Sequence, residues 1–381
     1  MDLQEYREAI GKVDDELLRL FLERMDISYQ IAQHKKEAGM ADSDTVQERE
    51  MLYKIGEKAG AGMRTYAHAL YSLLFELGRA HQSSLYNAES ELYKHITDAM
   101  ENTEKEFPGA ALAACQGVEG AYSQIVCDRL FSEPSIFYFN SFDGVFSAIR
   151  DSLCRYGVLP LENSTAGSVN MVYDLMMRYE FKIVRSVRLK IDHNLLAKPG
   201  VAKAGIREIY SHEQAINQCA EYLKGLKKDV KITAVVNTAE AAKMVAESDR
   251  DDVAALSSRA CCDLYGLKCL DSSVQDKGNN YTRFICISKD LEIYPGSNRT
   301  SIMLTTAHKP GALYKVLGLF YALGINVVKL ESRPIPDRDF EFMFYFDLET
   351  SVYSKEFRQL MCELENLCEE FHYLGSYLEI I

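Results

Sequence analysis

The first hundred residues repeat apolar side chains with the seven-residue period of a long helix. One series recurs every seven residues and a second follows it three residues later, as the seam of a coiled coil requires. The two series are Leu3, Ile10, Leu17, Arg24 and Ile31, and Tyr6, Val13, Leu20 and Ile27. A helix over residues 3–37 is about 50 Å long, beyond the roughly 13 Å radius of gyration of a domain of one hundred residues. We therefore predict that this helix pairs with a second copy in an intertwined dimer.

Two zones with other periods follow the helical one. Residues 109–288 alternate short apolar strands with amphipathic helices, which is typical of a mainly parallel, two-lobed α/β domain that binds ligands at strand ends. From residue 299 to 381 the order strand, helix, strand, strand, helix, strand predicts a ferredoxin-like α+β domain. The helical domain is expected over 1–90, and a charged stretch ending in Phe107-Pro108-Gly109 predicts a linker over 91–108.

Composition excludes several classes of function. A net charge of −13 over 381 residues disfavours a duplex nucleic-acid binder. The ten cysteines form no CxxC motif and have no histidine-rich companion, so we expect neither metal nor disulfide, and a reducing cytoplasm. No apolar run approaches the roughly 20 residues that span a bilayer, and the acidic start is unlike a signal peptide. No GxGxxG follows a strand, which disfavours a nicotinamide dehydrogenase.

Arg24 is the exception within its heptad series. A guanidinium on an apolar seam requires an anionic partner, because an unpaired buried charge is very costly. Arg7 and Lys35 flank the same seam, and Glu48 lies on the inward stripe of the next helix. These groups predict either a pocket for an anionic ligand or interhelical salt bridges such as Arg24 with Glu48.

A second polar cluster stands where a core strand begins. Thr282 and Arg283 precede the run Phe284–Ile287, whose apolar side chains suit a strand buried on both faces of a parallel sheet. A hydroxyl beside a guanidinium at a strand end suggests chemistry on an anion. A polar surface loop that enters a core strand explains the same pattern.

Over its whole length the chain resembles the bifunctional chorismate mutase–prephenate dehydratase family. The resemblance rests on Asn280–Phe284, Pro160–Ser164, Gly311–Leu313 and Glu331–Pro334, in the order in which the family has them. It implies an all-helical mutase domain in an intertwined dimer and a two-lobed α/β dehydratase domain like a periplasmic binding protein. It further implies a ferredoxin-like ACT domain, named after its regulatory family, at the end of the chain.

The resemblance also implies three sets of site residues. The mutase pocket falls on Arg7, Arg24, Lys35, Asp44, Glu48 and Gln82, with Arg7 serving the partner chain's pocket. The dehydratase site falls on Asn163, Ser211, Gln218, Thr282 and Arg283, with Thr282 as the essential threonine. The phenylalanine site falls on Gly311, Ala312, Leu313, Glu331, Ser332, Arg333 and Pro334.

The function implied is conversion of chorismate to prephenate, and of prephenate to phenylpyruvate with loss of water and carbon dioxide. Phenylalanine would inhibit it; no cofactor or metal is expected, and the assembly would be a homodimer or homotetramer. Two alternatives remain open: a dehydratase whose mutase-like domain only dimerises, and a non-catalytic amino-acid sensor. The chain departs from the family pattern at Gln47, Gly78, Val118, Ala121 and Tyr314.

Overall fold

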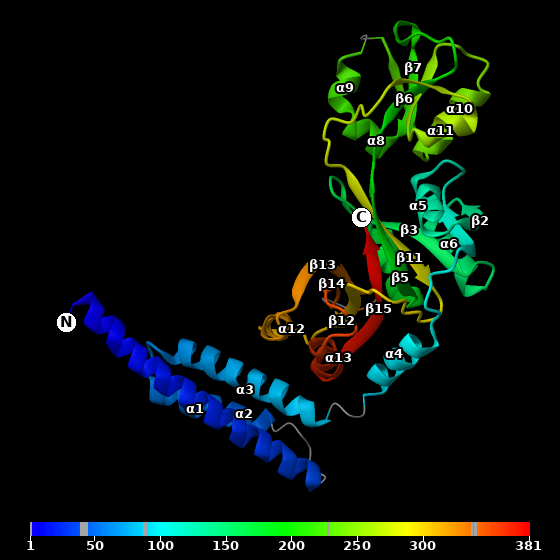
Figure 1. Cartoon of the computed structure of the whole chain (residues 1–381). Helices are drawn as coiled ribbons and strands as arrows, with labels where there is room; N and C mark the ends of the chain where they lie inside the picture. Colours follow the sequence, from blue (N-terminus) through cyan, green and yellow to red (C-terminus); the bar gives the residue numbers. More distant parts are fainter. Residues whose placement is uncertain (1, 39–44, 87–89, 227–228, 337, 339–340) are drawn as a thin grey trace.

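The helical zone forms an arm of three helices that projects from one side of the molecule (Figure 1), and its third helix contacts the two helices of the C-terminal domain. The computed structural model describes residues 2–38, 45–86, 90–226, 229–336, 338 and 341–381. The arm consists of α1 (Leu3–Glu37), α2 (Thr45–Ala59) and α3 (Arg64–Tyr86). Asp2 and Glu5 start α1 with a reciprocal capping box, in which each side chain accepts from the other residue's backbone N–H. The predicted helix over residues 3–37 is confirmed.

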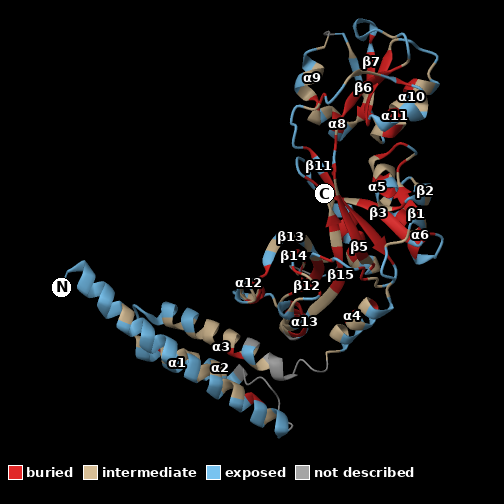
Figure 2. Ribbon diagram, in the orientation of Figure 1, coloured by how far each residue is buried: buried red, intermediate tan, exposed pale blue. Residues whose placement is uncertain are grey.

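The apolar seam of α1 lies open on the arm. Its apolar members are between 47% exposed at Leu20 and 67% exposed at Leu3, and within the described part of α1 only Ala32 is buried. Figure 2 shows the arm largely exposed, whereas the remaining domains have buried centres. A surface of this size needs a partner to cover it, so the intertwined dimer stays our prediction.

A helix stands where a linker was expected. Helix α4 (Glu91–Asn102) begins after Ser90, whose hydroxyl accepts from the Tyr93 N–H at 3.0 Å. Ile96 is fully buried and Ala99 nearly so, in a core shared with the C-terminal helices. The apolar stripe of α4 packs into the core of the C-terminal domain and so anchors the connection to it. The sequence pattern did not reveal this helix because charged residues follow it directly.

The first lobe of the middle zone is a mixed sheet covered by helices. Its elements are β1 (Ala110–Gln116), α5 (Tyr122–Leu130), β2 (Glu133–Phe139), α6 (Phe142–Arg150), β3 (Tyr156–Asn163), β4 (Gly167–Ser168), α7 (Asn170–Tyr179), β5 (Lys182–Lys190) and β11 (Tyr281–Ser288). Strand β11 runs antiparallel to both β3 and β5, so the expected parallel setting is wrong. Its residues are apolar on both faces because Ile285 and Ile287 enter one core and Phe284 and Cys286 another.

The second lobe is a smaller sheet with the strand order β10-β6-β9-β7-β8. Its elements are β6 (Asn194–Ala197), a 3₁₀ turn (Lys203–Gly205), β7 (Glu208–His212), α8 (Glu213–Gln218), α9 (Ala220–Lys224), β8 (Lys231–Val235), α10 (Thr238–Glu247), β9 (Val253–Ser257), α11 (Ala260–Tyr265) and β10 (Lys268–Asp271). The chain enters this lobe after β5 and leaves it before β11. The two-lobed architecture is therefore confirmed.

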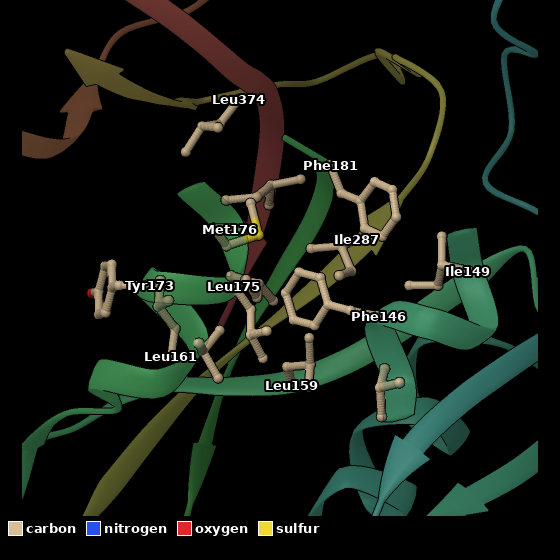
Figure 3. Close-up of a cluster of buried hydrophobic side chains, with 14 of the residues drawn as sticks. Phe146, Ile149, Leu159, Leu161, Tyr173, Leu175, Met176, Phe181, Ile287 and Leu374 are labelled. Atoms are coloured by element: carbon tan, nitrogen blue, oxygen red, sulfur yellow. The ribbon is translucent and has the colours of Figure 1, made fainter. Parts of the chain in front are cut away.

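The C-terminal domain has the predicted βαββαβ order. Its elements are β12 (Arg299–Thr305), α12 (Ala312–Ala322), β13 (Asn326–Pro334), β14 (Phe342–Glu349), α13 (Lys355–Leu367) and β15 (Glu370–Ile380). Strand β15 then pairs in parallel with β5, which joins this domain and the first lobe into one ten-stranded sheet. The two also share a core, in which Leu374 of β15 lies near Met176 and Ile287 (Figure 3).

Gly375 is required where β15 approaches β5. Its φ is +140°, and a Cβ atom at this position would lie 2.4 Å from the carbonyl oxygen of Ile183. A side chain here would force the two strands apart.

Candidate functional sites

The two lobes enclose a cleft of about 500 Å³ to which both contribute side chains. Of the five predicted dehydratase residues, Asn163, Gln218 and Thr282 line it, from β3, α8 and β11. Because β3 and β11 are antiparallel, the end of β3 meets the start of β11, and Thr282 stands directly opposite Asn163. The strand pairing thus brings together two residues that are far apart in the sequence.

Hydrogen bonds fix the orientation of Asn163 and, through it, that of Thr282. The Asn163 Oδ1 atom accepts from the backbone N–H groups of Thr165 (3.0 Å) and Ala166 (2.9 Å). Its Nδ2 atom therefore donates to Thr282 Oγ1, at 2.8 Å. Since the Thr282 oxygen is the acceptor in this bond, its own proton is free to point into the cleft.

Gln218 and His193 extend this network across the cleft. Gln218 Nε2 donates to Thr165 Oγ1 at 2.7 Å, and its Oε1 accepts from Asn280 Nδ2 at 3.0 Å. His193 Nε2 lies 2.9 Å from the same Oε1, which assigns the proton to Nε2. Burial lowers the pKa of His193, so the ring is neutral at pH 7.

Ser211 and Arg283 lie outside the lining of the cleft. Ser211 is fully buried, and its hydroxyl donates to the Leu256 carbonyl at 2.8 Å. Helix α8 is capped by His212, whose ring accepts from the Gln214 N–H at 3.3 Å. Arg283 points away from the cleft and pairs with Asp347 of β14.

In the helical arm, Arg24 lies beside two groups of α3. Its Nη1 donates to the Leu74 carbonyl at 2.9 Å, and its guanidinium stands 5.4 Å from the centre of the Phe75 ring. Burial lowers its pKa. Gln82 donates to the carbonyl (2.8 Å) and hydroxyl (2.6 Å) of Ser28, one helical turn from Arg24.

Of the other predicted mutase residues, some lie near Arg24 and Gln82 and others lie farther along the arm. Glu48 pairs with Arg79 of α3, and no direct bond between Glu48 and Arg24 is present among the described residues. Lys35 lies eleven residues beyond Arg24, about three turns along the same face of α1. Arg7 is roughly 25 Å from Arg24 along the helix axis at 1.5 Å per residue, and Asp44 lies outside the described residues. A single chain therefore does not bring Arg7 to Arg24.

The C-terminal domain has a separate hollow of about 380 Å³ at the start of α12. Ala312 and Leu313 line it, and Gly311 precedes the helix with a φ of +84°. The other predicted phenylalanine residues lie elsewhere: Glu331 and Arg333 contact the first lobe through Ser168 and Asp174, while Ser332 and Pro334 are exposed on the opposite face of β13.

Comparison with known families matches each zone in turn. The chorismate mutase type II model covers residues 6–83, the prephenate dehydratase model residues 113–292 and the ACT domain model residues 300–354. Arogenate dehydratase/prephenate dehydratase 2 of Arabidopsis thaliana is 36% identical over 278 residues, which are 69% of this chain and 72% of that protein. The bifunctional chorismate mutase/prephenate dehydratase of Aquifex aeolicus is 28% identical over 379 residues, 99% of this chain and 98% of that one.

The chain belongs to the bifunctional chorismate mutase–prephenate dehydratase family. A crystal structure of prephenate dehydratase from Arthrobacter aurescens in complex with L-Phe has the same fold as the last two domains. It superposes with a TM-score of 0.64 at 23% identity, over 70% of this chain and 89% of that one. We therefore use the names mutase arm, dehydratase domain (with its dehydratase cleft) and ACT domain for the three zones.

Within the part of the chain that the structure describes, no three His, Cys, Asp or Glu side chains are grouped to hold a metal ion. None of the described helices has the length and apolar character needed to cross a membrane.

Several residues of these sites were missing from the sequence-based prediction, among them His193, Arg79 and Ser168. His193 was a lone histidine in the sequence, and only the fold brings it to Gln218. Arg79 lies on α3 and pairs with Glu48 of α2. Ser168, at the rim of the dehydratase cleft, accepts from Lys329 Nζ at 2.8 Å. Its position five residues after Asn163 was the one feature of the sequence that could have indicated its place near the cleft.

Proposed function

We propose that this protein converts chorismate to prephenate in the mutase arm and prephenate to phenylpyruvate in the dehydratase cleft, under inhibition by phenylalanine. The observation that carries the proposal is the Thr282–Asn163 pair in the interlobe cleft of a chain with mutase, dehydratase and ACT domains in order. No cofactor is needed, because one reaction rearranges its substrate and the other fragments it, and neither exchanges electrons with another molecule.

The mutase step is a pericyclic rearrangement of a dianion, so it needs fixed charges and no nucleophile. Arg24, with Arg7 of the second chain, binds the two carboxylates, and Lys35 and Gln82 donate to the ether oxygen as its bond breaks. Glu48 accepts from the ring hydroxyl and holds the reactive conformer. The Leu74 carbonyl already orients the Arg24 guanidinium, which supports its role as a preorganised cation.

In the dehydratase step, the substrate loses its ring carboxylate as carbon dioxide and its hydroxyl as water. The electron pair of the breaking C–C bond enters the ring and expels the hydroxyl group from the opposite ring carbon. The Thr282 O–H donates to this leaving oxygen, and the proton that turns the hydroxyl into water is supplied in net from solvent, so that Thr282 ends the step with its hydrogen. Asn163 occupies the Thr282 lone pair and keeps the O–H directed at the substrate. Gln218 positions the loop at Thr165 that orients Asn163.

For regulation, we propose that phenylalanine occupies the hollow at Ala312 and Leu313. Ser332 and Pro334 are exposed on β13 and do not reach this hollow within one chain. A second ACT domain would supply them, so the effector would be held between two copies. Binding of this kind inhibits only if the two states of the assembly differ in their affinity for phenylalanine.

The two active sites give a crossed test. Lys35→Ala should lower prephenate formation about 100-fold or more, because one transition-state donor is lost, and leave phenylpyruvate formation from prephenate unchanged. Thr282→Ala should lower phenylpyruvate formation by at least about 100-fold and leave prephenate formation unchanged. Thr282→Ser, which keeps the hydroxyl, is the matched control and should retain most of the activity.

The alternatives give different outcomes in the same assays. A dehydratase with a merely dimerising arm would consume no chorismate, and a non-catalytic sensor would act on neither substrate. Equal loss of both activities in Thr282→Ala would indicate a folding defect and withdraw the assignment of Thr282.

A further inference from the structure

Two neighbouring side-chain pairs of β3 and β11 face opposite sides of the sheet. Successive side chains of a strand alternate between its faces. The cross-strand pair Thr282–Asn163 faces the dehydratase cleft, and the next pair, Arg283–Glu162, faces the ACT domain. The register shifts between Arg283 and Phe284, directly after the Arg283–Glu162 pair and one residue beyond the Thr282–Asn163 pair. Shifts of this kind mark β-bulges, which orient side chains next to active sites.

On the ACT side, a buried carboxylate of β14 holds Arg283. The Nη2 atom of Arg283 pairs with Asp347. The Nε atom of Arg283 lies 3.0 Å from Glu162 Oε1 but is not aligned for a hydrogen bond. Arg283 is 3% exposed and Asp347 fully buried. Burial opposes the charge on Arg283 most strongly, but Asp347, the Tyr345 and Tyr377 hydroxyls and Glu162 together outweigh it and raise the pKa of the guanidinium. Arg283 is therefore a permanent cation committed to Asp347.

Asp347 is in turn fixed by the strands of the ACT domain. Its Oδ1 accepts from the hydroxyls of Ser301, Tyr345 (2.6 Å) and Tyr377 (3.3 Å). These donors belong to β12, β14 and β15. A displacement of these strands relative to the dehydratase domain must therefore carry the carboxylate that holds Arg283.

A second set of contacts joins β13 to the rim of the dehydratase cleft. Lys329 Nζ lies 2.9 Å from Glu162 Oε2 and donates to Ser168 Oγ at 2.8 Å. The Ser168 hydroxyl donates to Glu331. Because Ser168 lines the cleft, the strand with the predicted effector residues touches the dehydratase site directly.

We propose that Arg283 is a positioning residue of the dehydratase site, and that its ion pair with Asp347 transmits the state of the ACT domain to Thr282. The inference rests on the proposed function, because it takes the cleft as the dehydratase site and the ACT domain as the phenylalanine sensor. Coupling requires an element that both sites bias. Strand β14 is that element: it carries Asp347, and the Arg283 backbone is continuous with that of Thr282.

This assignment differs from a role for Arg283 in binding a prephenate carboxylate. To reach the substrate, the guanidinium would have to leave Asp347 and cross the sheet, which would strand a buried carboxylate. The two roles predict different behaviour when both members of the pair are replaced by apolar side chains. Such replacements are tolerated in other proteins because they leave no unpaired charge.

The test compares Arg283→Met, Asp347→Leu and the double variant in the full-length protein. Arg283→Met should lower the dehydratase kcat by about 100-fold, as a misplacement of about 1 Å does, with the prephenate KM within about threefold of wild type. The double variant should recover kcat to within about fivefold of wild type. It should bind phenylalanine in calorimetry as wild type does and no longer be inhibited by it.

Arg188→Met is the matched control. Arg188 pairs with Glu379 at 2.6 Å across the same joint between β5 and β15. It stands opposite Arg283 in the pairing of β5 with β11, but among the described residues no hydrogen bond or ion pair joins it to Thr282, Asn163 or Asp347. This variant should keep the wild-type dehydratase rate and its inhibition by phenylalanine.

Two results would overturn the proposal. One is a double variant as inactive as Arg283→Met with a KM raised tenfold or more, which would make Arg283 a substrate ligand. The other is a double variant that phenylalanine inhibits at the wild-type concentration. If either variant fails to fold, Arg283→Lys serves instead: it keeps the charge but cannot span Asp347 and Glu162. Unchanged inhibition of folded Arg283→Lys would equally refute the coupling.

Failure of the proposed function is recognised separately. If wild type makes no phenylpyruvate from prephenate, the dehydratase assignment fails before any variant is compared. If wild type is active and inhibited, the variants report on the coupling alone.

Discussion

The dehydratase and ACT domains form one continuous body, whereas the mutase arm leaves its main apolar surface uncovered. The first two share a ten-stranded sheet, an apolar core and the Arg283–Asp347 pair. The arm places Leu17 and Ile10 at 55% and 61% exposure on the seam of α1. One region is therefore completed within the chain, and for the other we predict a second copy.

This difference bears on how each site works. The predicted dehydratase residues Thr282, Asn163 and Gln218 meet in one chain, where Asn163 donates to Thr282 at 2.8 Å and Gln218 donates to Asn163 at 3.4 Å. In the arm, Arg24 and Gln82 are in place, but Arg7 lies far along the same helix. We therefore propose that the dehydratase is open to control by a domain of its own chain, while the mutase depends on association.

The largest effect is expected from a charge on the seam. Leu17→Lys should dissociate the dimer and lower mutase activity about 100-fold or more, since each pocket then lacks the Arg7 of the second chain. Dehydratase activity per chain should change by less than about threefold, because its cleft is complete. Sedimentation velocity with both enzyme assays measures this.

Asp15→Lys is the control for that variant. Asp15 is exposed on α1, two positions before Leu17 and off both heptad series. A similar loss of mutase activity in Asp15→Lys, or a Leu17→Lys protein that stays dimeric and active, would contradict the comparison.

The joint between the dehydratase and ACT domains should respond to Gly375→Ala. The added Cβ would meet the Ile183 carbonyl at 2.4 Å, and the combined clash and backbone strain should cost about 3 kcal/mol of unfolding free energy. Gly296→Ala isolates the strain, because Gly296 also has a positive φ of +84° but no atom within 4 Å of its Cβ position. It should cost only about 1 kcal/mol in the same urea titration. Equal costs would show that the approach of β15 to β5 is not tight.

The smallest effect concerns the histidine of the dehydratase cleft and pH. Because burial lowers the folded-state pKa of His193 from 6.5, the unfolded chain binds more protons below that pH. The stabilising contribution is complete above about pH 6.5 and is lost progressively as the pH falls. From pH 7 to 5 the unfolding free energy of wild type should drop by about 1 kcal/mol more than that of His193→Gln. His95→Gln, at an exposed histidine of α4, should behave as wild type, and parallel curves for all three would refute the prediction.

Periodic patterns allowed much of the fold to be predicted. The heptads predicted the bounds of α1, because a seven-residue period places the apolar residues on one face of a helix whether or not a single chain covers that face. The direction of β11 was missed because apolar residues on both faces occur in any doubly covered strand, and here the ACT domain supplies the second cover. Helix α4 was missed because its short apolar stripe precedes a charged segment.

Some residues of the candidate sites were predicted from the sequence and others were not, because local patterns do not reveal contacts between distant parts of the chain. Thr282 and Asn163 each end or begin a strand, so motif and position agreed. For Arg283, adjacency to Thr282 suggested the same site, but strand alternation turns it to the ACT domain. His193 and Arg79 act through partners that are distant in the sequence, which a single sequence does not reveal.

The most direct test of the contrast between the two regions is complementation between inactive chains. Arg7→Ala and Lys35→Ala chains, co-expressed in equal amounts, should regain about a quarter of wild-type mutase activity, since half of the dimers are mixed and one of their two pockets is intact. Thr282→Ala and Asn163→Ala chains should regain no dehydratase activity, because their defects lie in one cleft of one chain. Absence of recovery in the first pair, or recovery in the second, would contradict the account.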